Sequence, residues 1–158
     1  MAGAFDYAPV IVLLPFLSFL LATTVAASGR DLLPKGGAYG GIAAMVGSFV
    51  LSLWVLVAVN AQGTYQETLY TWTAGGADAI SLTFGVLLDP LSALMLLIVT
   101  LISLLVHVFS LGYMNDEGET GLPRYYAGLG LFTTSMLGFV VADNLLLAFM
   151  FFELVGLC

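Results

Sequence analysis

The residue of this sequence that is best suited to acid–base chemistry is Glu153, an acid within a long apolar run. It lies about ten residues after Asp143-Asn144, and the residues around it from Phe149 to Leu157 are apolar. In a helix this position is about 14 Å deep, close to the middle of a bilayer core about 30 Å thick. An ionisable group at that depth costs roughly 3 kcal/mol and usually serves ions, protons or substrates. We therefore expect Glu153 to handle protons, the alternative being a protonated acid that hydrogen-bonds to a neighbouring helix as a structural contact.

Two further residues are candidates for a proton path. His107 lies about 17 residues after Pro90 in another apolar run, and histidine is the side chain whose charge changes most readily near physiological pH. It either relays protons or packs with one nitrogen satisfied. Asp143 either contributes to the same path or caps the helix of Glu153, where a carboxylate meets the positive helix end. Asp89 is expected to cap the helix that follows it in the same way.

The composition leaves few other kinds of site. The 158 residues carry 3 Lys+Arg and 10 Asp+Glu, a net charge of −7, and only 8% are charged whereas 61% are hydrophobic. A soluble domain has about 25% charged residues, so a soluble enzyme, a disordered segment and a basic nucleic-acid partner are excluded. One cysteine, Cys158, and one histidine cannot form a disulfide framework or a multi-Cys or multi-His metal site. We expect no metal here, and nucleotide binding has no supporting phosphate loop.

The apolar runs predict a membrane-spanning helix bundle. A bilayer crossing needs about 20 apolar residues, and four runs reach that length, with a fifth that begins after Asp143-Asn144 and is about 15 residues long. The four are Pro9–Ala27, Ala38–Val59, Pro90–Tyr113 and Tyr125–Ala142. Because the fifth is too short to cross, we expect the chain to be an N-terminal piece of a longer protein; the alternatives are a re-entrant helix or a small membrane protein complete at Cys158.

Three positive charges predict the orientation of the helices. Arg30 and Lys35 lie in the first connection and Arg124 at the end of the third, whereas the long second connection, residues 60–88, has no Lys or Arg. Cytoplasmic loops collect Lys and Arg. The first and third connections are therefore expected inside, and the N-terminus and the second and fourth connections outside.

The second connection has the pattern of a β-hairpin. Apolar residues alternate with polar ones or glycine in its second half, its first half is Thr-rich and aromatic, and small residues between them signal a turn. These three groups are Ile80, Leu82, Phe84 and Val86; Tyr65, Leu69, Tyr70 and Trp72; and Ala74-Gly75-Gly76-Ala77. The hairpin either covers the helix ends or docks a neighbouring subunit.

These features together predict an all-α polytopic membrane protein with a short extracytoplasmic β-hairpin between its second and third helices. Residues 1–59 would form the first two helices, residues 60–88 the outer loop, and residues 89–158 helices three, four and the start of five. Gly37 and Gly41 form a G-x-x-x-G pattern at the start of the second helix, which predicts that this helix approaches another backbone closely.

Four motifs, taken with their order and spacing, resemble the start of subunit L, also called chain 5, of respiratory complex I. They are Leu88-Asp89-Pro90-Leu91-Ser92-Ala93, the segment His107 to Met114, Arg124-Tyr125-Tyr126-Ala127, and Val141 to Leu147 followed by Phe152 to Cys158. The family is related to the large subunits of multi-component Na⁺/H⁺ antiporters. The resemblance implies two inverted five-helix repeats, of which this chain would hold the first helices. Glu153 occupies the position of the family's functional acid, which pairs with a lysine on a later helix.

The resemblance also implies a function. It points to a membrane-arm, antiporter-like subunit that couples electron transfer to proton translocation in a complex I-type NADH:quinone oxidoreductase of a prokaryotic plasma membrane. No cofactor is expected in this chain; the donor, flavin, iron–sulfur clusters and quinone would bind partner subunits, and other membrane-arm subunits, lipid and protons would be its partners. Alternatives are the large subunit of a cation/proton antiporter and a membrane subunit of a hydrogenase-linked or bicarbonate-uptake complex. The electron donor and the quinone stay open, and the acidic, lysine-poor loops would suit a high-salt organism.

Overall fold

The computed structural model of the chain describes residues 2–28, 37–73, 82–114 and 121–158. A short 3₁₀ helix, Ala2–Tyr7, leads into α1, and the helices and strands follow in the order that the sequence predicts. They are α1 Ala8–Ser28, α2 Ala38–Gln62, β1 Tyr65–Thr73, β2 Leu82–Leu88, α3 Pro90–Tyr113, α4 Leu122–Val141 and α5 Leu145–Leu157. The predicted helical protein with a hairpin between its second and third helices is therefore confirmed.

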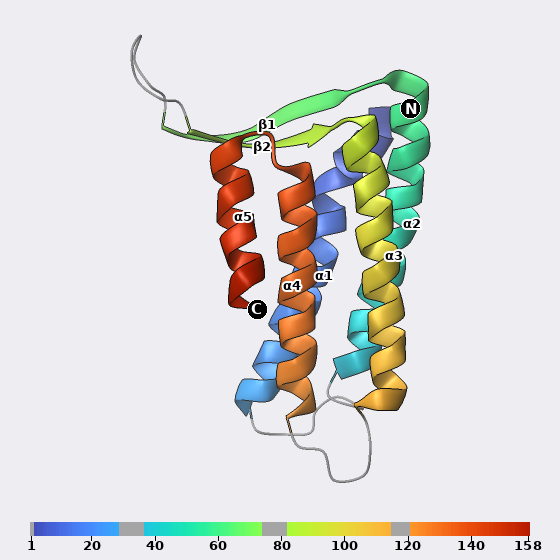
Figure 1. Cartoon of the computed structure of the whole chain (residues 1–158), viewed down its shortest axis with the longest axis vertical. Coiled ribbons are helices and arrows are strands. Elements are labelled where there is room, and N and C mark those ends of the chain that lie inside the picture. The colour runs from blue at the N-terminus through green and yellow to red at the C-terminus, as the bar shows by residue number, and fades with distance from the viewer. Residues whose placement is uncertain (1, 29–36, 74–81, 115–120) are drawn as a thin grey trace.

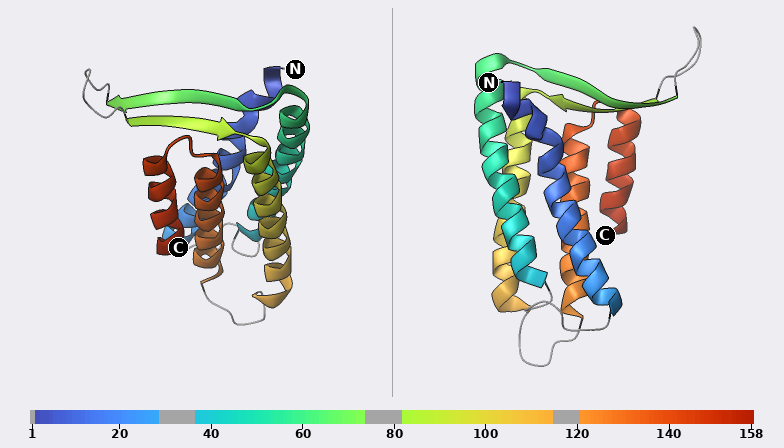
Figure 2. Two further views of the ribbon diagram at one scale, coloured as in Figure 1. Left: turned by 45° about the horizontal axis from the view of Figure 1, so that its top comes forward. Right: turned by 180° about the vertical axis from the view of Figure 1, so that it is seen from behind.

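The first four helices form an up-and-down bundle, and α5 lies beside it. α1 packs against α2 and α4, α3 packs against the same two helices, and α5 packs against α4. The hairpin lies across one end of the bundle, where α1, α3 and α5 begin and α2 and α4 end (Figures 1 and 2). The opposite end carries Ser28, Ala38, Tyr113 and Leu122. The predicted pairing of the connections, second with fourth and first with third, is thus correct, because each helix reverses the direction of the one before it.

Three described helices, α1, α2 and α3, are long and apolar enough to cross a membrane. The chain is therefore an integral membrane protein. The predicted fourth span, α4, has 20 residues but is not one of these three, since Arg124 lies in its first turn. It also contains Thr133-Thr134-Ser135. All three of these side chains are buried. A helix that turns polar side chains toward other helices needs less apolar surface of its own.

Local signals explain where α3 and α4 begin. Asp89 caps α3 as predicted, because its carboxylate accepts the backbone N–H of Ser92 at 2.6 Å, and Pro90 follows in the first turn. This hydrogen bond, together with that from the Ser92 side chain, lowers the pKa of Asp89 below its ordinary value. α4 begins at Leu122, three residues before the predicted Tyr125, since Gly121 adopts a left-handed conformation with φ of 98°.

The two strands pair antiparallel, from Tyr65 opposite Leu88 to Thr73 opposite Leu82, with irregularities in register around Leu69 and Trp72. Bulges of this kind add twist and end regular pairing locally. The predicted turn residues 74–77 and Ile80 lie outside the described residues. Val86 of β2 is buried in the core of its own chain, whereas Tyr70 of β1 is 64% exposed.

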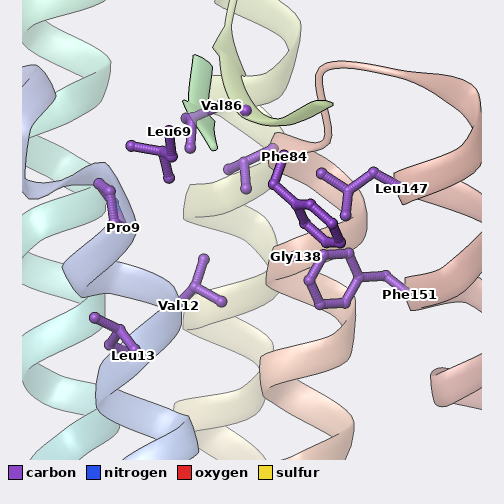
Figure 3. Close-up of a pocket in the computed structure, with 11 residues that line it drawn as sticks. Pro9, Val12, Leu13, Leu69, Phe84, Val86, Gly138, Leu147 and Phe151 are labelled. Atoms are coloured by element: carbon purple, nitrogen blue, oxygen red, sulfur yellow. The ribbon is translucent and has the colours of Figure 1, made fainter. Parts of the chain in front are cut away.

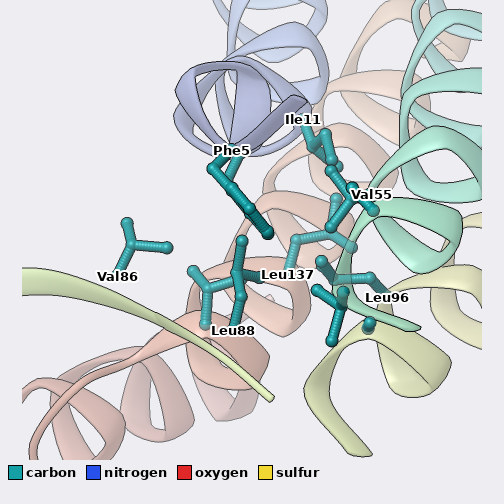
Figure 4. Packing of buried hydrophobic residues seen from close by; sticks show 12 residues of the cluster. Phe5, Ile11, Val55, Val86, Leu88, Leu96 and Leu137 are labelled. Atoms are coloured by element: carbon teal, nitrogen blue, oxygen red, sulfur yellow. The ribbon is translucent and has the colours of Figure 1, made fainter. Parts of the chain in front are cut away.

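The core at the hairpin end joins four helices to the sheet. Phe5 stacks on Tyr65 with ring centroids 4.6 Å apart, and buried side chains of β2 meet those of the helices. Figure 4 shows this packing among Phe5, Ile11, Val55, Val86, Leu88, Leu96 and Leu137. A second buried group at the other end consists of Ala22, Ala38, Tyr126 and Ala127. The hairpin is thus part of the hydrophobic core at its end of the bundle.

Candidate functional site

Glu153 lies on an exposed face of α5. It is the ninth residue of this helix, about 12 Å along the axis from Leu145. The side chain is exposed, as are those of Phe149 and Phe152 on the same helix. The described residues therefore do not enclose Glu153, which faces away from the four-helix bundle.

Asn144, and not Asp143, caps α5. The side-chain oxygen of Asn144 accepts the backbone N–H of Leu147 at 2.8 Å, and its backbone is extended as in other N-caps. The prediction that Asp143 caps this helix is wrong, because α5 begins one residue later than an Asp143 cap requires. Two roles remain for Asp143. One is to contact the hairpin, and the other is the predicted part in a proton path.

Asp143 lies half-buried between the α4–α5 turn and β2. Its carboxylate accepts hydrogen bonds from the Asn144 amide at 2.7 Å and from the Thr83 hydroxyl at 3.3 Å. The backbone of β2 also forms an isolated bridge from Val86 to Ala142. Asp143 therefore connects the hairpin to the start of α5.

The middle of α5 is held against α4 by a side chain in a glycine notch. A Cβ built on Gly138 would lie 2.5–2.6 Å from the ring of Phe151, so this close packing requires glycine. Phe151 lies two residues before Glu153. The contact thus fixes one side of α5 on α4 while Glu153 stays exposed.

His107 is fully buried within the four-helix bundle. Its Nδ1 lies 2.8 Å from the backbone carbonyl of Ser103, and since a carbonyl only accepts, Nδ1 is the donor. In the neutral ring Nε2 then carries a lone pair, and this atom has no hydrogen-bond partner among the described residues. Nε2 faces Gly41 of α2, where the three atoms nearest to an added Cβ belong to side chains. The close backbone approach that the G-x-x-x-G pattern predicts is therefore not seen at Gly41.

Hydroxyl groups connect α3 and α4 beside His107. The hydroxyls of Ser103 and Thr133 are 2.6 Å apart, and further along α3 those of Ser110 and Tyr125 are 2.8 Å apart. Ser103 also donates to the sulfur of Met45 at 3.2 Å. A cavity of about 250 Å³ between α3 and α4 is lined in part by Ser103 and Thr133. These contacts bring polar groups from three helices together around one end of the imidazole.

A larger groove of about 300 Å³ lies between the hairpin, α1, α4 and α5 (Figure 3). Its lining includes Leu13, Phe84, Leu147 and Phe151, and all of its lining residues are apolar or glycine. It therefore offers hydrocarbon contact and no side-chain hydrogen bond to a polar ligand.

The structure does not bring the three predicted site residues together. His107 is enclosed by the bundle, Asp143 contacts the hairpin, and Glu153 is exposed on α5. Among the described residues, no three His, Cys, Asp or Glu side chains group as metal ligands would. Sequence reasoning missed the Ser103–Thr133 pair and the role of Asn144. Residue type alone did not favour Asn144 over Asp143, because Asn and Asp are about equally good N-caps.

Comparison with known proteins places this geometry in context. Residues 72–126 match the family described as NADH-ubiquinone oxidoreductase (complex I), chain 5 N-terminus. The chain is 38% identical over 155 residues to F(420)H(2) dehydrogenase subunit L of Methanosarcina mazei, an alignment that covers 97% of this chain and 21% of that protein. It is 37% identical to the chloroplastic NAD(P)H-quinone oxidoreductase subunit 5 of Zygnema circumcarinatum, covering 97% and 22%. The chain thus spans about a fifth of the length of these relatives.

The fold is similar to that of a solved respiratory complex. A chain in the structure of the membrane-bound sulfane sulfur reductase (MBS), described as an archaeal respiratory membrane complex, superposes with a TM-score of 0.70 over 95% of this chain and 28% of that chain. The sequence identity is 17%, so this likeness concerns the fold alone.

Proposed function

Because residues 72–126 belong to the family of complex I chain 5 N-termini, we propose that the chain acts in an antiporter-like membrane subunit that couples electron transfer to proton translocation. The relatives named above are subunits of an F(420)H(2) dehydrogenase and of an NAD(P)H-quinone oxidoreductase. We propose the same general class for this protein, with donor and quinone left open.

The observation that carries the proposal is the exposed carboxylate of Glu153 on an apolar helix. Its exposed neighbours Phe149, Phe152 and Leu157 suit a membrane or a protein partner, whereas a charged carboxylate in hydrocarbon is costly. A cation on a helix outside residues 1–158 would stabilise the charged form of Glu153. Withdrawal of that cation would favour proton uptake by the carboxylate. Such a pair loads and releases one proton for each movement of the cation, and this is the role we assign to Glu153.

His107 and its hydroxyl neighbours are proposed as a second proton-handling group. The imidazole donates through Nδ1 and keeps a free lone pair at Nε2, so it can accept a proton at one nitrogen and release another at the opposite nitrogen. Ser103 and Thr133 extend the polar contacts from α3 to α4 at 2.6 Å. Transfer from His107 to Glu153 requires groups that lie between the bundle and the exposed side of α5.

The surroundings of the subunit follow from the same proposal. The bundle end with the hairpin and the N-terminus would face outside a prokaryotic plasma membrane, because Arg30, Lys35 and Arg124 belong to the connections at the opposite end. Later helices of the full-length protein would cover the face of α5 that carries Glu153, and partner subunits of the membrane arm would adjoin the hairpin. The donor site, flavin, iron–sulfur clusters and quinone would be in partner subunits.

The decisive experiment replaces Glu153 by Gln in the full-length protein. Gln keeps the shape and hydrogen-bonding ability but cannot ionise, so we expect an assembled complex whose coupled proton uptake falls sharply. Proton uptake into vesicles is measured alongside quinone reduction, with assembly checked on native gels. Glu153→Asp should retain part of the uptake, since the acid remains with a shorter reach.

A matched control is available on the hairpin. Glu67 is exposed, and its carboxylate accepts the Tyr65 hydroxyl at 2.6 Å. Glu67→Gln makes the same chemical change outside the helices and should leave proton uptake unchanged. Normal uptake by an assembled Glu153→Gln complex would overturn the assignment. Proton exchange for Na⁺ without any dependence on quinone reduction would instead favour the antiporter alternative.

A further inference from the structure

We propose that Asn144 is a positioning residue that fastens the start of α5 to strand β2 and thereby sets the placement of Glu153. The fastening itself is independent of the proposed function. Its consequence for proton transfer rests on that function, because it assumes that Glu153 carries the proton.

Asn144 uses both ends of its amide. The oxygen caps α5 by accepting the backbone N–H of Leu147 at 2.8 Å. The nitrogen donates to the backbone carbonyl of Thr83 at 2.7 Å and to the carboxylate of Asp143 at 2.7 Å. A helix cap needs the oxygen alone. The nitrogen therefore makes a separate connection, between α5 and a strand 61 positions earlier in the chain.

Asp143 and Gly85 complete the connection from the two sides. The Thr83 hydroxyl donates to the carboxylate of Asp143 at 3.3 Å, and a Cβ built on Gly85 would overlap that carboxylate. The same Cβ would lie 2.7 Å from the backbone carbonyl oxygen of Glu67 on β1. Glycine at position 85 thus creates the space in which the carboxylate lies. The side chains of Thr83, Asp143 and Asn144, with the space at Gly85, are called the hairpin latch below.

The latch affects the placement of α5 because it is one of a small number of described contacts that hold this helix. Leu147 is its buried residue, and most of its other side chains are exposed. Besides the latch at the first turn, the ring of Phe151 lies in the notch at Gly138, and the ring of Phe152 lies beside Phe139 of α4 with centroids 6.2 Å apart. Glu153 lies two residues beyond Phe151. If the latch opens, α5 can pivot about the notch, and the carboxylate changes its distance to any partner that faces it.

The variant Asn144→Asp separates the latch from the cap. Aspartate caps a helix about as well as asparagine, but its side chain cannot donate to Thr83, and it adds a second carboxylate beside Asp143. Asp89→Asn is the matched control, because it exchanges the same two residue types at the N-cap of α3. Gly85→Ala tests the latch from the β2 side if Asn144→Asp does not assemble.

The first readout is structural. Nitroxide labels are placed on the native Cys158, the residue after Leu157, and on Tyr70→Cys, whose side chain is exposed on β1. Other cysteines of the full-length protein are removed. Loss of a hydrogen bond of ordinary strength should raise the population with altered label distances about fivefold. We expect this change in Asn144→Asp and Gly85→Ala but not in Asp89→Asn. An unchanged distance distribution in the assembled latch variants would overturn the proposal.

The second readout is proton uptake per quinone reduced, measured at several pH values. We expect the latch variants to lower this ratio and shift its pH profile, because Glu153 then meets its partner at a different distance, while Asp89→Asn leaves both unchanged. Altered distances with a normal ratio and profile would overturn the link to Glu153. Failure of the proposed function would give a different result, because an assembled Glu153→Gln complex would then take up protons normally. This result does not depend on the label distances.

Discussion

The imidazole of His107 packs directly on the backbone of Gly41. Its Cδ2 and Nε2 atoms lie 2.9 and 3.2 Å from the point where a Cβ on Gly41 would be. Ser18 of α1 is near the same point, since its hydroxyl oxygen is 3.5 Å away. The glycine of α2 therefore makes room for a histidine of α3, and each residue limits what the other position can hold.

Gly41→Ala should therefore destabilise the bundle and displace His107. The added methyl group overlaps the ring, and overpacking of this kind costs about 1–3 kcal/mol. Denaturant or thermal unfolding in detergent measures the loss. Gly40→Ala is the control, because a Cβ there meets no atom within 4 Å and alanine is the better helix former. Equal stability of the two variants would contradict the packing described here.

His107→Phe should lower coupled proton uptake in an assembled complex. Phenylalanine fills a similar volume but has neither the Nδ1 donor nor the Nε2 lone pair. The measurement is proton uptake per quinone reduced. The control is Thr100→Val, an equally buried change in α3 at a hydroxyl that bonds carbonyls of its own helix. If His107→Phe pumps normally and only its stability changes, the histidine is a packing residue.

Asp89 should make the stability of the chain depend on acid. Because its pKa is lowered in the folded chain, its contribution is present above the ordinary aspartate pKa of about 3.9 and is lost as the pH falls through the lowered folded value. Asp89→Ala should cost about 1 kcal/mol at pH 7. Asp89→Asn should keep the cap and lose this acid dependence. Unfolding midpoints between about pH 2 and pH 7 provide the test; parallel curves for the native protein and the Asp89→Asn variant would contradict it.

Reporter fusions should place residues 28–37 and 115–123 on one side of the membrane and residues 62–84 on the other. The helix directions require the two groups to differ if α1 to α4 all cross, and the distribution of Lys and Arg predicts that the first group is cytoplasmic. Alkaline phosphatase and green fluorescent protein fusions report the two sides. Cytoplasmic signal from residues 62–84 would reverse the orientation.

A crosslinker on the hairpin should reach an adjoining membrane subunit in the intact complex. Tyr70 and Leu69 of β1 are 64% and 53% exposed, whereas Val86 of β2 is covered by its own chain. We therefore expect a partner subunit to contact the apolar side chains of β1. A photoreactive residue at Tyr70 tests this by mass spectrometry. Crosslinks confined to its own subunit would count against a docking role, and the same probe at exposed Glu67 serves as a comparison.

Local chemistry explains why the sequence alone predicted some elements closely. α3 begins and ends at the predicted residues, because Asp89-Pro90 is a start signal that needs no distant partner. Apolar runs of membrane length likewise predicted α1, α2 and α3, since the cost of exposing backbone polar groups in hydrocarbon leaves helices as the solution for such runs. Alternation of side chains predicted the hairpin for the same kind of local reason.

Relations between distant residues were decided only by the tertiary structure. Asp143 and Asn144 are both good caps by type, and the choice of Asn144 goes with an amide that also reaches Thr83, 61 positions away. Nothing in the G-x-x-x-G pattern indicates that His107 is what lies against Gly41. The depth of Glu153 follows from counting residues along a helix, but the face it presents depends on how α5 rotates when Phe151 enters the notch at Gly138. Helix formation is a property of neighbouring residues, whereas rotation and contact are properties of packing.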